Sequence, residues 1–464
     1  MYSKILKNIV FPIYQMGLQR DERYMTYMNL LDKTQWWSYS DLEKLQLKSL
    51  RQLLQHAYDN VPFYHALFKK ISFRPQDVSS VDDLNKIPIL TKEIINKNFN
   101  ELYARNYPKE EFILSSTGGS TATPMKFYID KKWEACNMAA AYRSWSWAGY
   151  NLGDKMAYLW SAPQDLQDTS YLNKFRNYLL RTIYLDAFDL TDENMNKYTK
   201  ILTRFKPKII NTYSSVIFTF SEYIERMGID TIKPKTIVTT SDMLYDYKRR
   251  SIEKAFNCEV FDYYSGRDTT LQAAECSEHF GYHLSIENAV VEFMKENEHV
   301  TAGETGNIII TDLCSYAMPF IRYEIGDLGT PSDEKCPCGR NLPIMKSLKG
   351  RTYDYILTSD GRLLSGIFFH HILVYYEIQG IKEFQIVQES KDKIILYIVK
   401  NENENIKDID RFVSLIKKNI GEKIEVELKY VSSLKRTPTG KLQHVISKLN
   451  RLDSRKGKYD FGGR

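Results

Sequence analysis

The sequence predicts an α/β fold with a large N-terminal domain, made of βαβ subdomains and a small barrel-like piece, and a small C-terminal α+β domain. Short apolar runs alternate with helical segments in the middle of the chain, which indicates βαβ units and a parallel sheet. From about residue 282 to 325 the apolar runs follow one another more closely, which favours antiparallel or barrel-like pairing. Because 464 residues exceed one simple core, we expect separate domains at residues 1–351 and 352–464.

The first predicted element is a helix that begins near Ser40. Apolar residues recur with a period of about 3.6 through residues 42–54, and Ser40 followed by Glu43 has the form of a capping box. We expect the helix to end near Asn60, because a proline at position 62 disfavours helical backbone just before it. The N-terminal stretch MYSKILKNIVFPIYQMG lacks the long apolar core of a signal peptide, so it is interpreted as an ordinary helix, with a peripheral membrane contact as the alternative.

The remaining elements follow from the same periodicities. Helices are expected over residues 132–149, 194–205 and 245–256, and over 409–420 in the C-terminal domain. Strands are expected at 156–160, 208–211, 235–239, 259–264, 290–293 and 307–311, and in the C-terminal domain at 383–387, 393–398 and 424–430.

Composition and charge exclude several classes of protein. Hydrophobic residues make up 43% and charged residues 26%, which is ordinary for a globular protein. The net charge of +6 is mild for this length, so no nucleic-acid partner is expected. No apolar run reaches the roughly 18 residues of a membrane-spanning helix, so no stable membrane insertion is expected. The 6 cysteines are too few for a disulfide framework, which makes a reducing cytoplasm the predicted location. The sequence does not indicate an oligomeric state.

The stretch SSTGGSTATPMKF, Ser115 to Phe127, differs from its surroundings in composition. A loop of Gly, Ser and Thr presents backbone N–H groups and hydroxyls that can hold phosphate oxygens. It lacks the Gly-Lys-Ser/Thr of a P-loop, so a P-loop nucleotidase is not expected. Taken alone, this stretch is either a linker or a phosphate-binding loop.

Further motifs lie downstream of this stretch. Their order and spacing, with the flanking segments HAYDNVPFYHALF and DLNKIPILTK, resemble the adenylate-forming enzymes, the superfamily of acyl-CoA synthetases and adenylation domains. Within it, the chain is most similar to the phenylacetate–CoA ligase branch and to CapK-like capsular polysaccharide biosynthesis proteins. The resemblance runs from about Trp36 to Lys448. The motifs are YYSGRD at 263–268, IRYEIGD at 321–327, GRTYD at 350–354 and KRTPTGK at 435–441.

The resemblance implies an ATP site. A reaction that joins a carboxylate to the α-phosphate of ATP needs donors and cations where negative charge develops. The loop Ser115–Thr121 would hold the β- and γ-phosphates, Tyr264 would pack beside the adenine, and Asp327 would accept hydrogen bonds from the ribose. The full set of implied nucleotide-binding residues is Ser115, Ser116, Thr117, Gly118, Gly119, Ser120, Thr121, Ser241, Asp242, Tyr263, Tyr264, Ser265, Gly266, Arg267, Asp327 and Arg351.

Lys441, Asp268 and Arg351 are the residues that the resemblance implies for catalysis. Lys441 matches the lysine that reaches into the site during adenylation, and a mobile point charge suits a shifting transition state. Arg351 would reach the ribose or a phosphate. Asp354 matches the hinge about which the small domain swings, so the C-terminal domain is expected to be mobile. The alternative for Lys441 is a solvated lysine in a glycine-containing turn.

Asp268 stands where the family usually has a glutamate that binds Mg²⁺, and an aspartate is one methylene shorter. Ser265 and Arg267 are further departures from the family pattern. The alternative for Asp268 is the N-cap of a following helix, and the same alternative applies to Ser241 and Asp242. The alternative for Asp327 is a turn residue.

A second constellation of residues implies a structural Zn²⁺ site. Cys336 and Cys338 form a Cys-x-Cys pair, and Cys276 is followed by His279 and His283. Relatives in this branch show such a set, and three cysteines with one histidine suit tetrahedral zinc. His283 is preferred over His279 as the fourth ligand. The alternative is that these are free thiols in turns.

The predicted function is ATP-dependent activation of a carboxylic acid as an acyl-adenylate. The implied cofactors are ATP and Mg²⁺, with CoA as the default acceptor. The CapK-like resemblance adds a sugar precursor or a carrier protein as other acceptors, in capsular or surface polysaccharide biosynthesis. The alternative class is a catalytically degenerate protein of the same fold that binds a nucleotide or a partner; Ser265 and Asp268 favour it. The sequence does not identify the acid.

Overall fold

The structure is a computed structural model in which the chain forms two compact units, Met1–Gly350 and Arg351–Arg464. The division falls one residue from the predicted boundary. The residues that the structure describes are 2–5, 9, 23–116, 125–160, 171–187, 190–241, 243–351, 355–357, 363–365, 369, 378, 380–400, 408–435 and 444–449.

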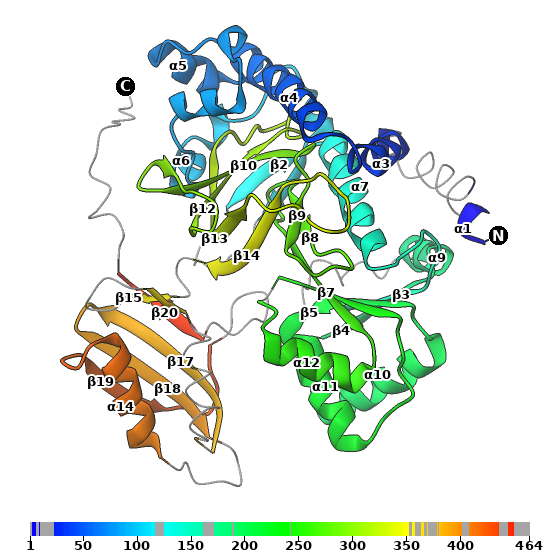
Figure 1. Ribbon diagram of the computed structural model, residues 1–464, viewed down its shortest axis with the longest axis vertical. Coiled ribbons are helices and arrows are strands. Elements are labelled where there is room, and N and C mark those ends of the chain that lie inside the picture. The colour runs from blue at the N-terminus through cyan, green and yellow to red at the C-terminus, as the bar shows by residue number, and fades with distance from the viewer. Residues whose placement is uncertain are drawn as a thin grey trace. The chain divides into compact units, whose positions relative to one another are not determined.

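The first unit is organised around a 12-stranded mixed sheet in the order β11-β10-β12-β13-β14-β9-β8-β7-β6-β5-β3-β4 (Figure 1). Strands β3 to β7 pair in parallel, whereas β7 pairs antiparallel with β8, β8 with β9, and β9 with β14. The segment predicted to be barrel-like therefore forms antiparallel strands that extend the same sheet. The strands are β3 Met156–Trp160, β4 Thr182–Asp186, β5 Ile209–Tyr213, β6 Thr236–Thr240, β7 Glu259–Ser265, β8 Gln272–Ala274, β9 Tyr282–Leu284, β10 Ala289–Lys295, β11 Glu298–His299, β12 Gly306–Asp312, β13 Tyr323–Ser332 and β14 Ile344–Arg351.

The parallel strands are covered on both faces, as parallel sheets require. One face packs against three helices in a core that contains Leu159, Ile210, Ile237 and Val260. On the other face, Trp145 of a helix lies near rings of β3 and β7. The helices are α10 Asp192–Phe205, α11 Ser214–Met227 and α12 Asp246–Phe256 on the first face, and α7 Lys131–Trp147 on the second, with α9 Tyr171–Leu179 before β4.

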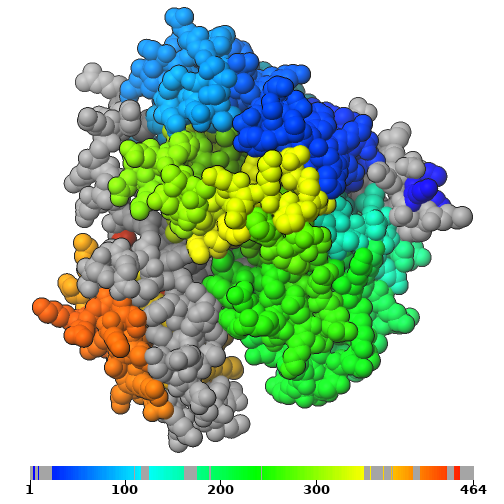
Figure 2. Space-filling view, viewed as in Figure 1, coloured from blue at the N-terminus to red at the C-terminus, as the bar shows by residue number. Residues whose placement is uncertain are grey.

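The antiparallel strands are joined to the N-terminal helical residues by buried polar contacts. Figure 2 shows these two parts side by side, the N-terminal residues in blue and the strands in yellow and yellow-green. Arg322, which is buried with φ 53°, donates to the carbonyl of Ile87 at 2.7 Å and forms an ion pair with Glu292 at 2.9 Å. The helices are α1 Tyr2–Ile5, α3 Arg23–Thr34, α4 Tyr39–Asn60, α5 Pro62–Lys70 and α6 Lys92–Lys97, with 3-10 turns at Pro75–Asp77, Val81–Lys86, Phe99–Glu101 and Lys109–Glu111.

The first predicted helix exists, but its start was predicted wrongly. Helix α4 is capped by Ser38, whose side chain accepts from the backbone N–H of Asp41, so Ser40 lies inside the helix. The predicted end at Asn60 is confirmed. In the part of the chain that the structure describes, no helix is long and apolar enough to cross a membrane.

The Ser/Thr/Gly stretch is bounded by two paired strands. β1 Ile113–Ser116 pairs antiparallel with β2 Lys126–Ile129, with Ser115 opposite Phe127. Residues 117–124 lie outside the described residues. Because the strands on either side pair within the first unit, the interpretation as an interdomain linker is wrong.

The second unit is a small α+β fold, as predicted. Its 4-stranded sheet has the order β19-β18-β17-β20. Phe412, Ile416 and Ile420 of the helix are buried in one core with Ile386 and Leu396 of the sheet. The elements are β15 Tyr355–Leu357, β16 Leu363–Ser365, β17 Ile381–Ser390, β18 Lys393–Lys400, α14 Ile409–Ile420, β19 Glu425–Tyr430 and β20 Val445–Ser447.

Candidate functional site

Strands β7 and β13 bring two of the predicted nucleotide-binding residues into direct contact. The Tyr264 hydroxyl donates to Asp327 Oδ2 at 2.8 Å, and both side chains are buried. Asp327 lies within β13, so its interpretation as a turn residue is wrong. A carboxylate that keeps acceptor capacity beside a tyrosine ring fits the two roles predicted for a ribose and an adenine.

Asp268 is joined to the same strand by a second tyrosine. The Tyr323 hydroxyl donates to Asp268 Oδ2 at 2.8 Å and lies 4.0 Å from the sulfur of Met125. Met125 directly precedes β2, so this contact places one end of the Ser/Thr/Gly stretch beside Asp268. We call Tyr264, Asp268, Tyr323 and Asp327 the carboxylate–tyrosine cluster.

Two small residues complete the surroundings of Asp268. A Cβ at Gly266 would meet Asp268 Oδ1 at 2.8 Å and Ile325 Cδ1 at 3.2 Å, so any larger residue there would displace the Asp268 carboxylate. The Thr269 hydroxyl is buried and has no hydrogen-bond partner among the described residues. A buried carboxylate beside an unpaired hydroxyl offers the oxygen ligands that Mg²⁺ prefers, so the residues present fit the predicted ion.

The helix-cap interpretations of Asp268 and Ser241 are wrong. The element that follows Asp268 is strand β8, and the N-cap of α12 is Tyr245. Ser241 instead follows β6 with φ 70°. A left-handed conformation at a non-glycine residue costs energy and is concentrated at functional sites. The carboxyl end of β6 is therefore a strained position beside the strand that carries Tyr264.

The other predicted nucleotide-binding residues are distributed differently. Tyr263 points to the opposite face of β7 from Tyr264, donates to Gln272 Oε1, and has its ring 6.5 Å from that of Trp145. Arg267 is exposed, and Ser115, Ser116 and Ser265 are half-buried. Arg351 is the last residue of β14. Residues that lie outside the described part of the chain are Thr117, Gly118, Gly119, Ser120, Thr121, Asp242, Asp354 and Lys441.

The predicted zinc ligands converge in the antiparallel part of the sheet. The ligand atoms of Cys276, His283, Cys336 and Cys338 all lie within 4.8 Å of one another. The Cys276 and Cys336 sulfurs are 3.6 Å apart, and Cys338 Sγ is 3.4 Å from His283 Nε2. In tetrahedral zinc with bonds of about 2.0–2.3 Å, ligand atoms are roughly 3.4–3.8 Å apart. The donor set, which we call the Cys/His cluster, therefore fits zinc.

The charges around the Cys/His cluster suit a cation between its ligands. Burial, with the positive charges of Arg340 and Arg143, lowers the pKa of His283 to about 4, so the imidazole is neutral as ligation requires. Burial raises the pKa of Cys276 to about 12. For Cys338 burial also raises the pKa, but hydrogen bonds from Arg340 outweigh it and lower the pKa overall. A bound metal ion would balance the negative charge of three closely spaced thiolates.

The structure distinguishes the two candidate histidines. His279 Nδ1 lies 3.1 Å from Glu275 Oε2 and 3.4 Å from Arg249, so it belongs to a separate polar group. His283 lies in the Cys/His cluster, in agreement with the predicted preference.

Sequence reasoning missed several residues of these sites. Tyr323 stands within the IRYEIGD motif but was given no role, although its hydroxyl holds Asp268. Thr269 directly follows the YYSGRD motif, and an extension of that motif by one residue could have found it. The resemblance placed the acyl pocket in parts of 158–162 and 211–215, which include Asn211, but Trp145, whose buried indole N–H has no partner among the described residues, had no sequence signal.

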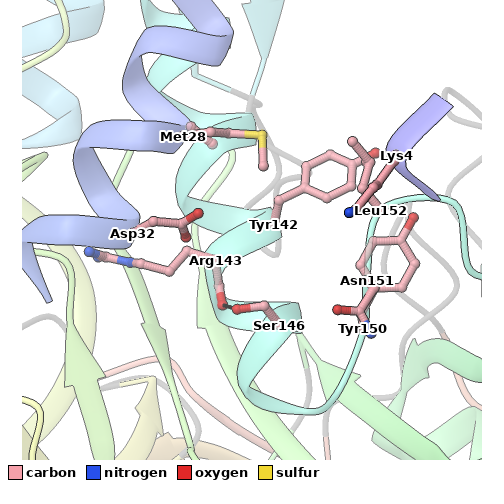
Figure 3. Close-up of a pocket in the computed structure, with 10 residues that line it drawn as sticks. Lys4, Met28, Asp32, Tyr142, Arg143, Ser146, Tyr150, Asn151 and Leu152 are labelled. Atoms are coloured by element: carbon pink, nitrogen blue, oxygen red, sulfur yellow. Dashed lines mark hydrogen bonds between the residues drawn. The ribbon is translucent and has the colours of Figure 1, made fainter. Parts of the chain in front are cut away.

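A cavity of about 230 Å³ lies between α3, α7 and the segment that follows α7 (Figure 3). Its lining includes Lys4, Asp32, Tyr142 and Arg143, and the guanidinium of Arg143 is paired with Glu287. None of the residues predicted for ATP or zinc lines it. This cavity is therefore separate from both clusters.

Comparisons with known proteins agree with this architecture. Residues 356–448 match the CapK C-terminal domain. The chain is 25% identical over 420 residues to protein CapK of Staphylococcus aureus, which covers 88% of this chain and 90% of CapK. It is 24% identical over 449 residues to a phenylacetate-coenzyme A ligase of Pseudomonas putida, which covers 90% of this chain and 97% of that ligase.

Solved structures show the same fold. A crystal structure of 2-hydroxyisobutyryl-CoA ligase in the postadenylation state, in complex with 2-HIB-AMP, matches with a TM-score of 0.68 at 18% identity and covers 91% of this chain and 94% of that chain. The likeness to this structure shows the fold alone.

These relatives support the class of adenylate-forming, AMP-forming ligases, and the solved structure agrees with them in fold. Within that class, the chain is a phenylacetate–CoA ligase-like, CapK-like protein. The predicted family, fold class and ligase class are confirmed at this level.

Proposed function

We propose that the protein activates a carboxylic acid with ATP and transfers the acyl group to CoA. A carboxylate oxygen attacks the α-phosphorus of ATP as the bond to pyrophosphate breaks, and a thiol sulfur then displaces AMP from the acyl carbon. The observation that carries the proposal is the carboxylate–tyrosine cluster, because two hydrogen bonds of 2.8 Å join residues that are far apart in the sequence at one place.

Each residue of the site has a role in this proposal. Asp327 accepts from the ribose hydroxyls and Tyr264 packs beside the adenine, while the loop Ser115–Thr121 holds the outgoing phosphates. Asp268 holds Mg²⁺, which neutralises charge on the phosphates. Arg351 binds the ribose or a phosphate, and Lys441 brings its charge to the transition state. The Cys/His cluster holds a structural Zn²⁺ and takes no part in the chemistry.

Pyrophosphate–ATP exchange across a panel of carboxylic acids tests the activity. We expect exchange with at least one acid and a loss of about 10²–10³-fold in Lys441→Ala, the scale of a lost transition-state contact. Lys448→Ala is the matched control, because Lys448 pairs with Glu389 at 2.7 Å and has no proposed role. Equal rates in the two variants would contradict the role of Lys441.

A degenerate binding protein is the second candidate, and Ser265 and Asp268 favour it. It predicts that the folded protein binds ATP but catalyses no exchange with any acid. Asp268→Glu restores the longer carboxylate of the family, and a large gain in exchange would show that the native aspartate limits activity.

The setting of the reaction is also part of the proposal. We place the protein in the cytoplasm and in capsular or surface polysaccharide biosynthesis, and the similarity to CapK supports this setting. In this setting, a sugar precursor or a carrier-protein thiol is the alternative acceptor to CoA. Release of AMP with each acceptor in turn, after the acid is known, separates these possibilities.

A further inference from the structure

Two buried polar atoms on the parallel half of the sheet have no partner among the described residues. They are Oδ1 of Asn211, on β5, and Nε1 of Trp145, on α7. The two side chains are only 2% and 7% exposed. A buried acceptor or donor without a partner costs about 1–3 kcal/mol, and such groups are rare in native proteins. Asn211 Oδ1 and Trp145 Nε1 are therefore an acceptor and a donor that the described protein groups leave available to a bound molecule.

The two atoms belong to the same region of the sheet. Asn211 is the register neighbour of Tyr158 on β3, so their side chains share one face. The Trp145 ring lies 6.4 Å from that of Tyr158 and 6.5 Å from that of Tyr263 on β7. Strands β5 and β6 separate β3 from β7. The indole therefore spans the strands between them, and Asn211 is on one of these strands.

Aromatic rings line this face from the middle of the parallel strands, where Asn211, Tyr158 and Tyr184 lie, to their carboxyl ends at Trp160 and Tyr213. Tyr184 stacks on Tyr158 at 4.6 Å, and Trp160 lies 4.5 Å from Tyr213 on β5. Ligands of open α/β sheets bind at these strand ends. Apolar walls with a few placed polar groups are typical of small-molecule sites.

We propose that the acid activated by this protein carries a hydroxyl group, which donates to Asn211 Oδ1 and accepts from Trp145 Nε1. This inference rests on the proposed function and names its substrate class. A hydroxyl both donates and accepts, whereas an ammonium group cannot accept from the indole and a carbonyl cannot donate to the amide oxygen. An acid without the hydroxyl leaves both atoms unpaired, which is the arrangement that discriminates strongly between substrates.

Matched pairs of acids test this inference. Pyrophosphate–ATP exchange is measured for benzoate against para-hydroxybenzoate, phenylacetate against para-hydroxyphenylacetate, and butyrate against beta-hydroxybutyrate. In the most active pair, we expect kcat/KM to be higher for the hydroxylated acid by about tenfold or more, because one unpaired buried group already costs this much. An equal or higher value for the unhydroxylated acid overturns the inference while leaving the proposed function intact.

Two variants test whether Asn211 and Trp145 cause the preference for the hydroxylated acid. Asn211→Leu and Trp145→Phe each remove one polar atom and keep most of the side-chain volume, so we expect the ratio of kcat/KM between the hydroxylated and the unhydroxylated acid to fall about tenfold. Asn307→Leu is the matched control, because Asn307 Oδ1 is also buried and unpaired but lies on β12. A preference unchanged in both variants overturns the inference.

Binding measurements test the hydroxyl contact independently of the proposed activity. If no acid supports exchange, the proposed function fails, and calorimetric titration of the same pairs into wild type and Asn211→Leu decides the hydroxyl contact alone. Selective binding of a hydroxylated acid that the variant loses supports the contact. Equal binding of both members of every pair, or binding of neither, refutes it.

Discussion

The Cys/His cluster and the carboxylate–tyrosine cluster lie in one sheet but differ in completeness. All four ligands of the Cys/His cluster come from the first unit and already face one another. The carboxylate–tyrosine cluster is also formed within that unit, but its predicted catalytic partner, Lys441, belongs to the second. The difference teaches that one unit alone can supply every ligand of a structural ion site, whereas the proposed ATP site also depends on Lys441, a residue of the second unit. Damage to the first should appear as lost stability and damage to the second as lost rate.

Removing the metal should have the largest effect on stability. Cys338→Ser takes one ligand from the Cys/His cluster, so we expect the metal content to fall from one equivalent of zinc toward none. Structural zinc in small domains is worth roughly 10–16 kcal/mol, and in this larger unit we expect a loss of about 5 kcal/mol. Metal analysis and thermal denaturation measure the two quantities. Cys258→Ser, outside the cluster, is the control. Wild-type protein without zinc, when never exposed to chelator, would remove the site.

The buried ion pair near the Cys/His cluster should be next in size. Arg143 and Glu287 pair at 2.6 Å with 2% of each side chain exposed. Glu287→Leu leaves the guanidinium buried and unpaired, so we expect a loss of about 3–5 kcal/mol in the free energy of unfolding. The double variant Arg143→Met/Glu287→Leu should recover most of that loss, and denaturant titration compares the three proteins. A double variant as unstable as the single would show that packing, and not the unpaired charge, causes the loss.

Asp312 makes stability near the carboxylate–tyrosine cluster depend on pH. It accepts from both the backbone and the hydroxyl of Thr270, which follows Thr269. Burial raises its pKa to about 6, although these bonds and others from Cys314 and Trp133 oppose the rise. The folded protein therefore holds this proton more tightly than the unfolded chain, whose carboxyl titrates near about 4. The resulting stabilisation is complete below that value and is lost as pH rises through about 6.

Comparison with Asp312→Asn isolates this contribution. Between pH of about 4 and about 6 the stability of wild type relative to the variant should fall by roughly 3 kcal/mol, the equivalent of about two pKa units. Thermal denaturation across this range measures the difference. A constant difference between the two proteins would contradict a raised pKa at Asp312.

Tyr264→Phe should have the smallest effect of these changes, and that effect should be on KM for ATP. It removes the hydroxyl that donates to Asp327 but keeps the ring proposed to pack beside the adenine. We expect KM for ATP to rise about fivefold, the scale of the roughly 1 kcal/mol that one hydrogen bond typically contributes, with kcat little changed. A change in zinc content or a large fall in Tm would show that the two clusters are not independent.

The parallel half of the fold could be predicted from the sequence because its strands are buried on both faces and form short apolar runs. Met156–Trp160 is predicted with its observed bounds. Strands β8 and β9 have three residues each, too few to show a period, and they depend on their neighbours for pairing. The start of α4 was missed because Ser38 and Ser40 are equally good local caps, and the bond from Asp41 decides between them.

The candidate sites could be predicted only where a motif carried them. The resemblance supplied Asp268 and Asp327, but the bond from Tyr323 to Asp268 crosses 55 positions and has no local pattern. The choice of His283 over His279 likewise depends on the sheet, because β9 pairs with β14, which follows the Cys-x-Cys pair. Asn211 Oδ1 and Trp145 Nε1 lack hydrogen-bond partners among the described residues because of how a helix packs on the sheet. A single sequence does not reveal that packing.

The contacts of Arg322 also set an order of assembly. Its guanidinium binds the carbonyl oxygens of Asn85 and Ile87, which leave the ribosome 237 and 235 positions earlier. Until Arg322 is synthesised, those oxygens remain bonded to water, and the adjoining β13 cannot dock. Contacts this distant in sequence form slowly. The strand that carries Tyr323 and Asp327 therefore makes these contacts only after the N-terminal segment has been synthesised, so a nascent chain completes the carboxylate–tyrosine cluster later than it synthesises its N-terminal helices.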